Sequence, residues 1–130
     1  MAYLLQLLIC AVALGLVHIF LAALLSTNTR GLPWGIGPRD DPGAPLTGIA
    51  GRIERASYNF QETFPLFAAA ILAGAAMGKD SNLMTLGAQL YLWGRVAYLP
   101  LYVIAIPFTR TIAWGVATAG IVLVLIPLFG

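Results

Sequence analysis

Apolar residues occur in four long blocks that are separated by polar stretches. The blocks cover about residues 3–26, 53–77, 83–106 and 111–129. A helix needs roughly 20 residues to cross the hydrocarbon core of a bilayer, and each block is close to or above that length. The pattern therefore predicts an all-α integral membrane protein, a bundle of four transmembrane helices in a single domain over residues 1–130.

The composition favours the same class of protein. Hydrophobic residues make up 60% of the chain and charged residues only 9%, which is far from the balance of a soluble domain. The net charge of +2 is too small to indicate nucleic-acid binding, and the aromatic residues sit in apolar runs rather than among basic ones. We therefore expect membrane lipids as partners and no nucleic acid.

The polar stretch over about residues 27–52 predicts a long first loop, since it contains four prolines and several glycines. Cations gather around this loop and around the third connection, whereas Lys79 is the one cation of the second connection. The positive-inside bias places the first and third loops in the cytoplasm and both termini on the other side. The first block lacks a basic leader and a small-residue cleavage site, so we expect it to be retained as a span. No organelle address is recognisable, and a bacterial inner membrane is the expected location.

The start of the second block carries polar residues that an apolar span would ordinarily exclude. In a helix, Arg55, Asn59 and Glu62 fall at i, i+4 and i+7 and share one face. A carboxylate at the edge of a transmembrane span either pairs with a partner group of the protein or has a functional role. In the third block, Arg95 lies at a depth where it could reach Glu62. A purely structural pair of Glu62 with Arg95 or Arg55 therefore stays open as an alternative.

A second polar stripe lies in the third block. It consists of one arginine and three tyrosines at i, i+4, i+7 and i+11 of a helix: Tyr91, Arg95, Tyr98 and Tyr102. Tyr91 and Tyr102 taken singly are more typical of packing or interface anchors than of catalysts. His18 lies within the first block, where a neutral imidazole bonded to a neighbouring helix is a simpler interpretation than a functional group. A lone histidine also gives poor support for a metal site.

Several of these residues form a motif: Arg55-Ala56-x-x-Asn59-x-x-Glu62-x-x-Pro65-Leu66-Phe67, with Arg95, Tyr98 and Tyr102 in the third block. This motif resembles that of the MAPEG proteins, the membrane-associated proteins in eicosanoid and glutathione metabolism. The similarity covers nearly the whole chain, with four spans, a long first loop, a short second loop and a basic residue that opens the fourth helix. The motif combines five positions within one transmembrane helix, which makes it fairly specific.

The resemblance implies a homotrimer of four-helix bundles that binds glutathione between neighbouring subunits near the cytoplasmic face. The residues that match glutathione contacts of the family are Arg30, Arg55, Asn59, Glu62, Arg95, Tyr98 and Tyr102. Arg110 and Thr111 look like the pair that opens the fourth helix, where the arginine helps to activate the thiol, and they are the candidate catalytic residues. Glutathione is then the cosubstrate, a lipophilic electrophile or hydroperoxide is the second substrate, and no metal is expected.

The chemistry of glutathione agrees with these residue types. Its two carboxylates need cations, for which the planar fork of arginine is suited, and its ammonium group needs an anion such as Glu62. We therefore predict a glutathione-dependent transferase or peroxidase. Two alternatives stay open: a non-catalytic MAPEG-like scaffold or binding protein, and a small multidrug-type transporter with four helices. The transporter class relies on a carboxylate in its first helix, and the first block here has none.

Overall fold

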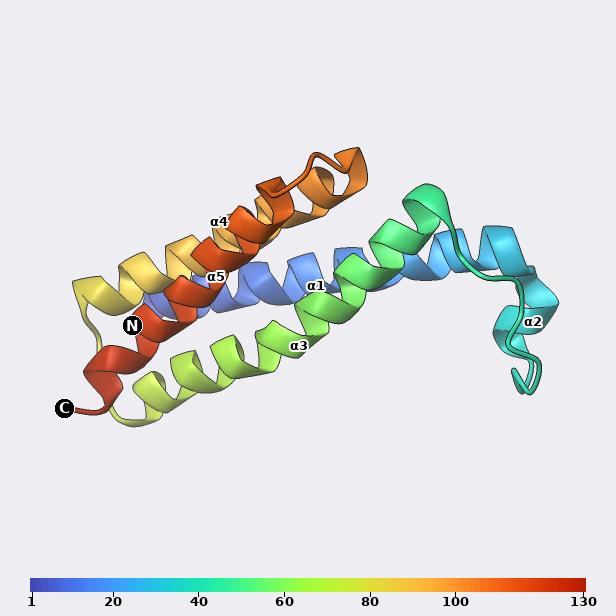
Figure 1. The fold of residues 1–130 in the computed structure, drawn as a ribbon. Coiled ribbons are helices and arrows are strands. Elements are labelled where there is room, and N and C mark those ends of the chain that lie inside the picture. Colours follow the sequence, from blue (N-terminus) through green and yellow to red (C-terminus); the bar gives the residue numbers. More distant parts are fainter.

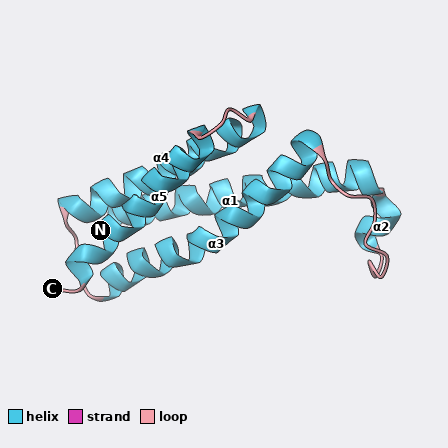
Figure 2. Ribbon diagram, viewed as in Figure 1, coloured by secondary structure: helices cyan, strands magenta, loops and turns pink.

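The computed structural model describes residues 1–130 as an all-helical chain without strands (Figure 2). Four of its helices are long, one is short, and a 3-10 turn follows the last. In order, the elements are α1 (Ala2–Arg30), α2 (Leu32–Ile36), α3 (Gly48–Ala76), α4 (Asn82–Ile104), α5 (Thr109–Leu125) and η1 (Ile126–Leu128). The four predicted helices are therefore present, each within a few residues of the expected bounds.

The long helices run alternately in opposite directions (Figure 1). Both termini and the α3–α4 connection, residues 77–81, lie at one end of the bundle, which we call the turn end. The connections over residues 31–47 and 105–108 lie toward the other end, which we call the loop end. α1 and α3 extend beyond the α4–α5 connection there, and α2 follows the far end of α1. The alternation follows from the short connections, because helices joined by a few residues pack as antiparallel neighbours.

The long first loop is shorter than predicted. The expected loop covered residues 27–52, but α1 continues to Arg30 and α3 begins at Gly48. At the end of α1, Arg30 Nη1 donates a hydrogen bond to Ser26 Oγ at 3.1 Å. Side chains four residues apart are neighbours on a helix, so this bond supports the last turn although its residues are polar. A count of apolar positions does not detect such a contact.

α4 and α5 pack against each other through small residues. A Cβ atom added at Gly120 would lie 2.5 Å from Gly87 O, and one added at Gly94 would lie 3.0 Å from Ala113 O. Such distances are shorter than van der Waals contact, so the two backbones touch and neither glycine can be enlarged without a shift. Small residues allow this close approach in a membrane, where packing rather than hydrophobic exclusion drives helix association.

The apolar core lies between the four long helices toward the turn end. Its fully buried members include Leu4 of α1, Phe67 of α3, Tyr91 of α4 and Val124 of α5. The rings of Phe67 and Tyr91 stack with their centroids 4.0 Å apart. Every long helix thus contributes an apolar face to one core, which fixes the helices relative to one another.

The connection at the turn end is tied to both termini. Lys79 Nζ donates to Pro127 O at 3.0 Å and to Leu128 O at 3.3 Å. The N-terminal ammonium group of Met1 forms an ion pair with Asp80. The lysine satisfies carbonyl groups that the end of a helix leaves free, so this end of the bundle is closed by its own residues.

Two helical segments are long and apolar enough to cross a membrane, α1 and the segment Thr109–Leu128. α3 and α4, which carry most of the polar candidates, do not meet the same criterion. Large apolar side chains are nevertheless exposed on α1, α3 and α4, as Phe20, Leu66 and Trp93 show with 68%, 63% and 65% of their surface accessible. Exposed apolar surface of this extent indicates contact with lipid or with another protein.

Candidate functional site

Two arginines from different helices converge on one tyrosine ring at the loop end. Arg55 of α3 donates from Nε to Tyr102 Oη at 2.9 Å, and its guanidinium carbon lies 5.8 Å from the ring centroid. The guanidinium carbon of Arg110, from α5, lies 4.6 Å from the same centroid. The electron-rich face of a tyrosine ring attracts cations. Neither arginine has a carboxylate within ion-pair distance, so both charges are available to an anionic ligand.

A cavity of about 200 Å³ opens beside this pair of arginines. Its lining residues are Arg52, Arg55, Tyr102, Ala105, Ile106, Pro107 and Arg110. Arg52 Nη1 donates to Val103 O at 2.8 Å, which holds its guanidinium at the end of α4. Three cations and no carboxylate line the cavity. This arrangement fits a carboxylate ligand, because a guanidinium group can bind a carboxylate through two parallel hydrogen bonds.

A smaller cavity of about 130 Å³ lies next to the first, and Arg110 lines both. The other lining residues of the smaller cavity are Asn59, Tyr98, Thr111 and Trp114. α4 continues through Pro100, and the ring centroids of Tyr98 and Tyr102 lie 5.7 Å apart. Three helices thus bring most of the predicted site residues to two adjoining cavities.

Arg95 is not among the residues that line either cavity. Its side chain is fully buried, and its Nη1 donates to Asn59 Oδ1 at 2.7 Å. Its guanidinium carbon lies 4.6 Å from the ring centroid of Tyr98 and 5.3 Å from that of Phe60. Its Nε and Nη2 have no hydrogen-bond partner. Arg95 therefore reaches the site through Asn59 rather than by facing it.

Glu62 is exposed on α3 and forms no ion pair, so the structural pairs with Arg95 and Arg55 are absent. The physical reason is the position of Asn59, which precedes Glu62 by three residues and accepts the hydrogen bond from Arg95 instead. Glu62 is left as an unpaired carboxylate on the surface of α3. Such a group can accept hydrogen bonds from a cationic ligand group.

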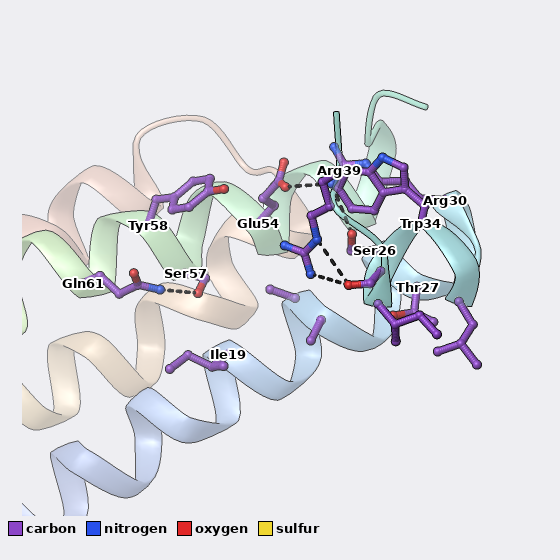
Figure 3. Close-up of a pocket in the computed structure, with 15 residues that line it drawn as sticks. Ile19, Ser26, Thr27, Arg30, Trp34, Arg39, Glu54, Ser57, Tyr58 and Gln61 are labelled. Carbon is purple, nitrogen blue, oxygen red and sulfur yellow. Dashed lines mark hydrogen bonds and ion pairs between the residues drawn. The ribbon is translucent and has the colours of Figure 1, made fainter. Parts of the chain in front are cut away.

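Arg30, the last residue of α1, packs against a different face of α3 from the one that lines the two cavities described above. There it lines a third cavity of about 500 Å³ between α1, α2 and α3 (Figure 3). Arg30 Nε donates to Ala44 O at 2.9 Å, and Arg30 Nη1 lies 3.5 Å from Glu54 Oε1. Its guanidinium carbon stacks 4.7 Å from the ring centroid of Trp34. Glu54 and Arg55 are consecutive on a helix and point about 100° apart. One chain therefore does not bring Arg30 together with Arg55.

The family of the chain follows from a comparison over nearly its whole length. The MAPEG family model matches residues 7–130. The chain belongs to the MAPEG family. Comparisons with curated proteins and with solved structures gave no match. MAPEG membership indicates a membrane protein of a family associated with glutathione, and it confirms the resemblance that the motif on α3 suggested.

Sequence reasoning missed three contributors to the polar surfaces of this MAPEG protein. Arg52 lines the first cavity one helical turn before Arg55, and its spacing of three residues was the signal that could have found it. Glu54 and Trp34 hold Arg30 through contacts that join α3 and α2 to α1. Helical spacing does not account for these contacts, because α1 ends at Arg30 before α2 begins at Leu32, and Glu54 reaches Arg30 only when the first connection folds.

Two buried polar residues of this MAPEG protein belong to its interior rather than to the candidate site. Tyr91 Oη lies 3.2 Å from Thr63 Oγ1, within hydrogen-bond distance. His18 Nδ1 donates to Leu14 O of its own helix at 2.9 Å, not to a neighbouring helix as expected. The ring of His18 stacks on Phe60 with the centroids 4.7 Å apart. No group of three or more His, Cys, Asp or Glu residues is placed to hold a metal ion.

Proposed function

We propose that this MAPEG protein is a membrane-embedded, glutathione-dependent transferase or peroxidase that acts on lipophilic electrophiles or hydroperoxides. The observation that carries the proposal is the convergence of Arg55 and Arg110 on Tyr102. This cluster lies beside cavities lined by cations and by neutral hydrogen-bonding groups. Membership of the MAPEG family supports an association with glutathione in general terms. In our proposal glutathione is the cosubstrate.

The proposed binding mode assigns one group of the protein to each charge of glutathione. Arg52 and Arg55 receive a carboxylate in the larger cavity, because they supply cations there without a competing acid. Glu62 accepts hydrogen bonds from the ammonium group, since its carboxylate is exposed and unpaired. Tyr98 and Tyr102 hold the peptide groups between these charged ends.

Arg110 and Thr111 are the proposed catalytic residues, because both line the smaller cavity. A neighbouring cation lowers the pKa of a thiol, and a hydroxyl group can donate a hydrogen bond to the thiolate sulfur. The thiolate forms a carbon–sulfur bond with an electrophile, whose leaving group departs with its electron pair. With a hydroperoxide, the sulfur attacks the terminal oxygen, the oxygen–oxygen bond breaks, and the alkoxide takes a proton. A second glutathione then converts the sulfenic acid to a disulfide and water.

The proposed assembly is a homotrimer in which α3 and α4 also cross the membrane. α3 exposes four polar side chains, those of Arg55, Tyr58, Gln61 and Glu62. Lipid chains cannot hydrogen-bond such groups, so we expect another copy of the chain to cover them. The surface of that copy around its Arg30 and Glu54 is polar enough to do so. The site then lies between subunits near the cytoplasmic face of a bacterial inner membrane, with both termini on the other side. Native mass spectrometry in detergent that shows only monomer would contradict the trimer.

Isothermal titration of the detergent-purified protein with glutathione tests the proposed function. We expect saturable binding by the wild type. Glu62→Gln and Arg55→Ala should each weaken binding by about tenfold or more, because each removes one partner of a charge-assisted hydrogen bond. Turnover of chlorodinitrobenzene and of cumene hydroperoxide should fall in parallel. Asp40→Asn is the matched control, since it neutralises an exposed carboxylate of the first loop and should bind as the wild type does.

The two contrary outcomes of this titration have different meanings. Absence of saturable binding by the wild type would favour the non-catalytic scaffold over the enzyme. Binding that survives both substitutions would show that glutathione lies elsewhere on the protein, for example in the cavity around Arg30.

A further inference from the structure

The buried hydrogen bond between Arg95 and Asn59 fixes which end of the Asn59 amide faces the site. Arginine carries only donors, so its partner atom on an asparagine has to be the carbonyl oxygen. Arg95 Nη1 lies 2.7 Å from Asn59 Oδ1, which is a typical length for a charge-assisted hydrogen bond. The two ends of an amide point in different directions. Asn59 Nδ2 is therefore directed away from Arg95.

The free end of the Asn59 amide is accessible, and Asn59 is a lining residue of the smaller cavity. Asn59 lines that cavity, whereas Arg95 does not. The enclosed polar atoms without a partner belong only to His18 and Arg95, so Asn59 Nδ2 is not enclosed by the chain. Arg110 and Thr111 line the same cavity. The amide hydrogens of Asn59 are thus available to a ligand that lies beside the proposed catalytic residues.

Arg95 is held in place at a cost to stability. Its guanidinium group is fully buried and stacks on the rings of Phe60 and Tyr98. Two of its nitrogen atoms have no hydrogen-bond partner, and no carboxylate pairs with it. A buried charge without a paired anion destabilises a protein. A residue of this kind, whose one hydrogen bond goes to Asn59, is better explained by a role at the site than by packing.

We propose that Arg95 is a positioning residue that acts through Asn59. It holds Asn59 Oδ1 so that Nδ2 presents its hydrogens to the cavity, as a donor to a carboxylate or carbonyl oxygen of the substrate. The inference rests on the proposed function and deepens it, because it states which part of glutathione Asn59 recognises. An asparagine that could turn its amide would accept either a donor or an acceptor, whereas the fixed one selects an acceptor.

Asn59→Asp separates the two ends of the amide. The new carboxylate keeps an acceptor for Arg95 and gives that cation a counter-ion, so the melting temperature in detergent should rise. The atom that faces the cavity changes from a donor to an acceptor, so the affinity for glutathione should fall by about 10-fold to 100-fold. A purely structural role would move stability and affinity in the same direction. Asn82→Asp, at the exposed start of α4, adds the same charge elsewhere and should leave the affinity unchanged.

Arg95→Met tests whether Arg95 acts through Asn59. Alone, it should weaken glutathione binding by about tenfold without changing the size-exclusion profile, because it frees the amide to turn. In an Asn59→Ala background it should have no further effect, since effects that pass through one shared residue are not additive. An equal loss of affinity in both backgrounds would overturn the inference. If Arg95→Met does not fold, the opposite shifts expected for Asn59→Asp decide the question alone.

Failure of the inference is distinguishable from failure of the proposed function. If the wild type does not bind glutathione, the proposed function is wrong. The orientation of Asn59 is then tested by the melting temperatures of the Asn59→Asp variants. The orientation stands if Asn59→Asp raises the melting temperature only while Arg95 is present. It is overturned if the rise is the same in the Arg95→Met background, or if Asn59→Asp lowers the melting temperature.

Discussion

The turn end and the loop end of this bundle use the same four helices in opposite ways. At the turn end, buried apolar side chains fill the space between the helices, and Lys79 donates to two backbone carbonyl groups. At the loop end, three arginines line a cavity without a carboxylate. Glu62, halfway along α3, is unpaired on the surface. The turn end is complete within one chain, whereas the loop end holds charges for which the chain supplies no partner.

The packing between α4 and α5 explains how this small bundle holds a charged site in place. α4 carries Tyr102 and α5 carries Arg110, so the distance between these helices sets the shape of both cavities. That distance is fixed by glycine contacts such as the one between Gly87 and Gly120. Packing on the turn-end side thus preorganises charge at the loop end, which is what a site for charged ligands needs.

The largest effect is expected from Gly120→Leu, which disrupts the close packing of α4 against α5. A Cβ atom alone would lie 2.5 Å from Gly87 O, and a backbone atom cannot rotate away. We expect a loss of about 3 kcal/mol or more. The measurement is size-exclusion chromatography in detergent, which should show loss of the monodisperse peak. Gly115→Leu is the matched control, because a Cβ atom there meets nothing within 4 Å and the variant should stay folded.

Arg110→Ala should remove function from the loop end and leave the fold intact. Arg110 is exposed, forms no ion pair and has only a weak contact with the ring of Tyr102, worth about 0.5–1 kcal/mol, so its loss should lower the melting temperature only slightly. Turnover should fall by about 100-fold, because the developing thiolate loses its neighbouring cation. Steady-state kinetics and the ultraviolet absorbance of bound thiolate measure this loss. A drop in melting temperature that matches the loss of activity would show instead that Arg110 is structural.

Tyr102→Phe tests how the side chain of Tyr102 holds the two arginines in place. The substitution keeps the ring that Arg55 and Arg110 share and removes only the oxygen that accepts from Arg55 Nε. One hydrogen bond is worth about 1 kcal/mol, so glutathione should bind about fivefold more weakly. Tyr102→Leu removes the aromatic face as well and should weaken binding further. Equal affinities of the two variants in a titration would mean that the ring has no part in the site.

The helices of this chain could be predicted from its sequence, because long apolar blocks leave little choice in a membrane protein. Their ends were less predictable, since α1 continues through polar residues to Arg30, where a side-chain contact between Ser26 and Arg30 supports the last turn. The first loop was consequently predicted to be longer than it is, and α2 within it was not predicted. Hydrophobic pattern determines which segments are helical, whereas polar contacts decide where each helix ends.

The candidate site could be predicted only in part. Helical spacing placed Arg55, Asn59 and Glu62 on one face of a helix and suggested Glu62 as the partner of Arg95, whereas in the structure Arg95 donates to Asn59. Spacing cannot tell whether Asn59 or Glu62 meets Arg95, because that depends on the relative rotation and height of α3 and α4, which packing along the whole bundle sets. The position of Arg30 depends in the same way on the folded first connection. Residues on one helix were therefore predictable as a group, and contacts between helices were not.

The smallest effect is expected from Lys79→Met, which tests whether the turn end can be weakened without disturbing the site. Methionine keeps much of the apolar stem of lysine but cannot donate to Pro127 O or Leu128 O. The loss should be about 1 kcal/mol, seen as a melting temperature lower by a few degrees. Glutathione affinity should be unchanged, because Lys79 lines neither cavity. In a double variant with Tyr102→Phe, the changes in melting temperature and in glutathione affinity should each equal the sum of those in the two single variants, since the sites are far apart. Non-additive effects would show that the closed end and the charged end are energetically coupled.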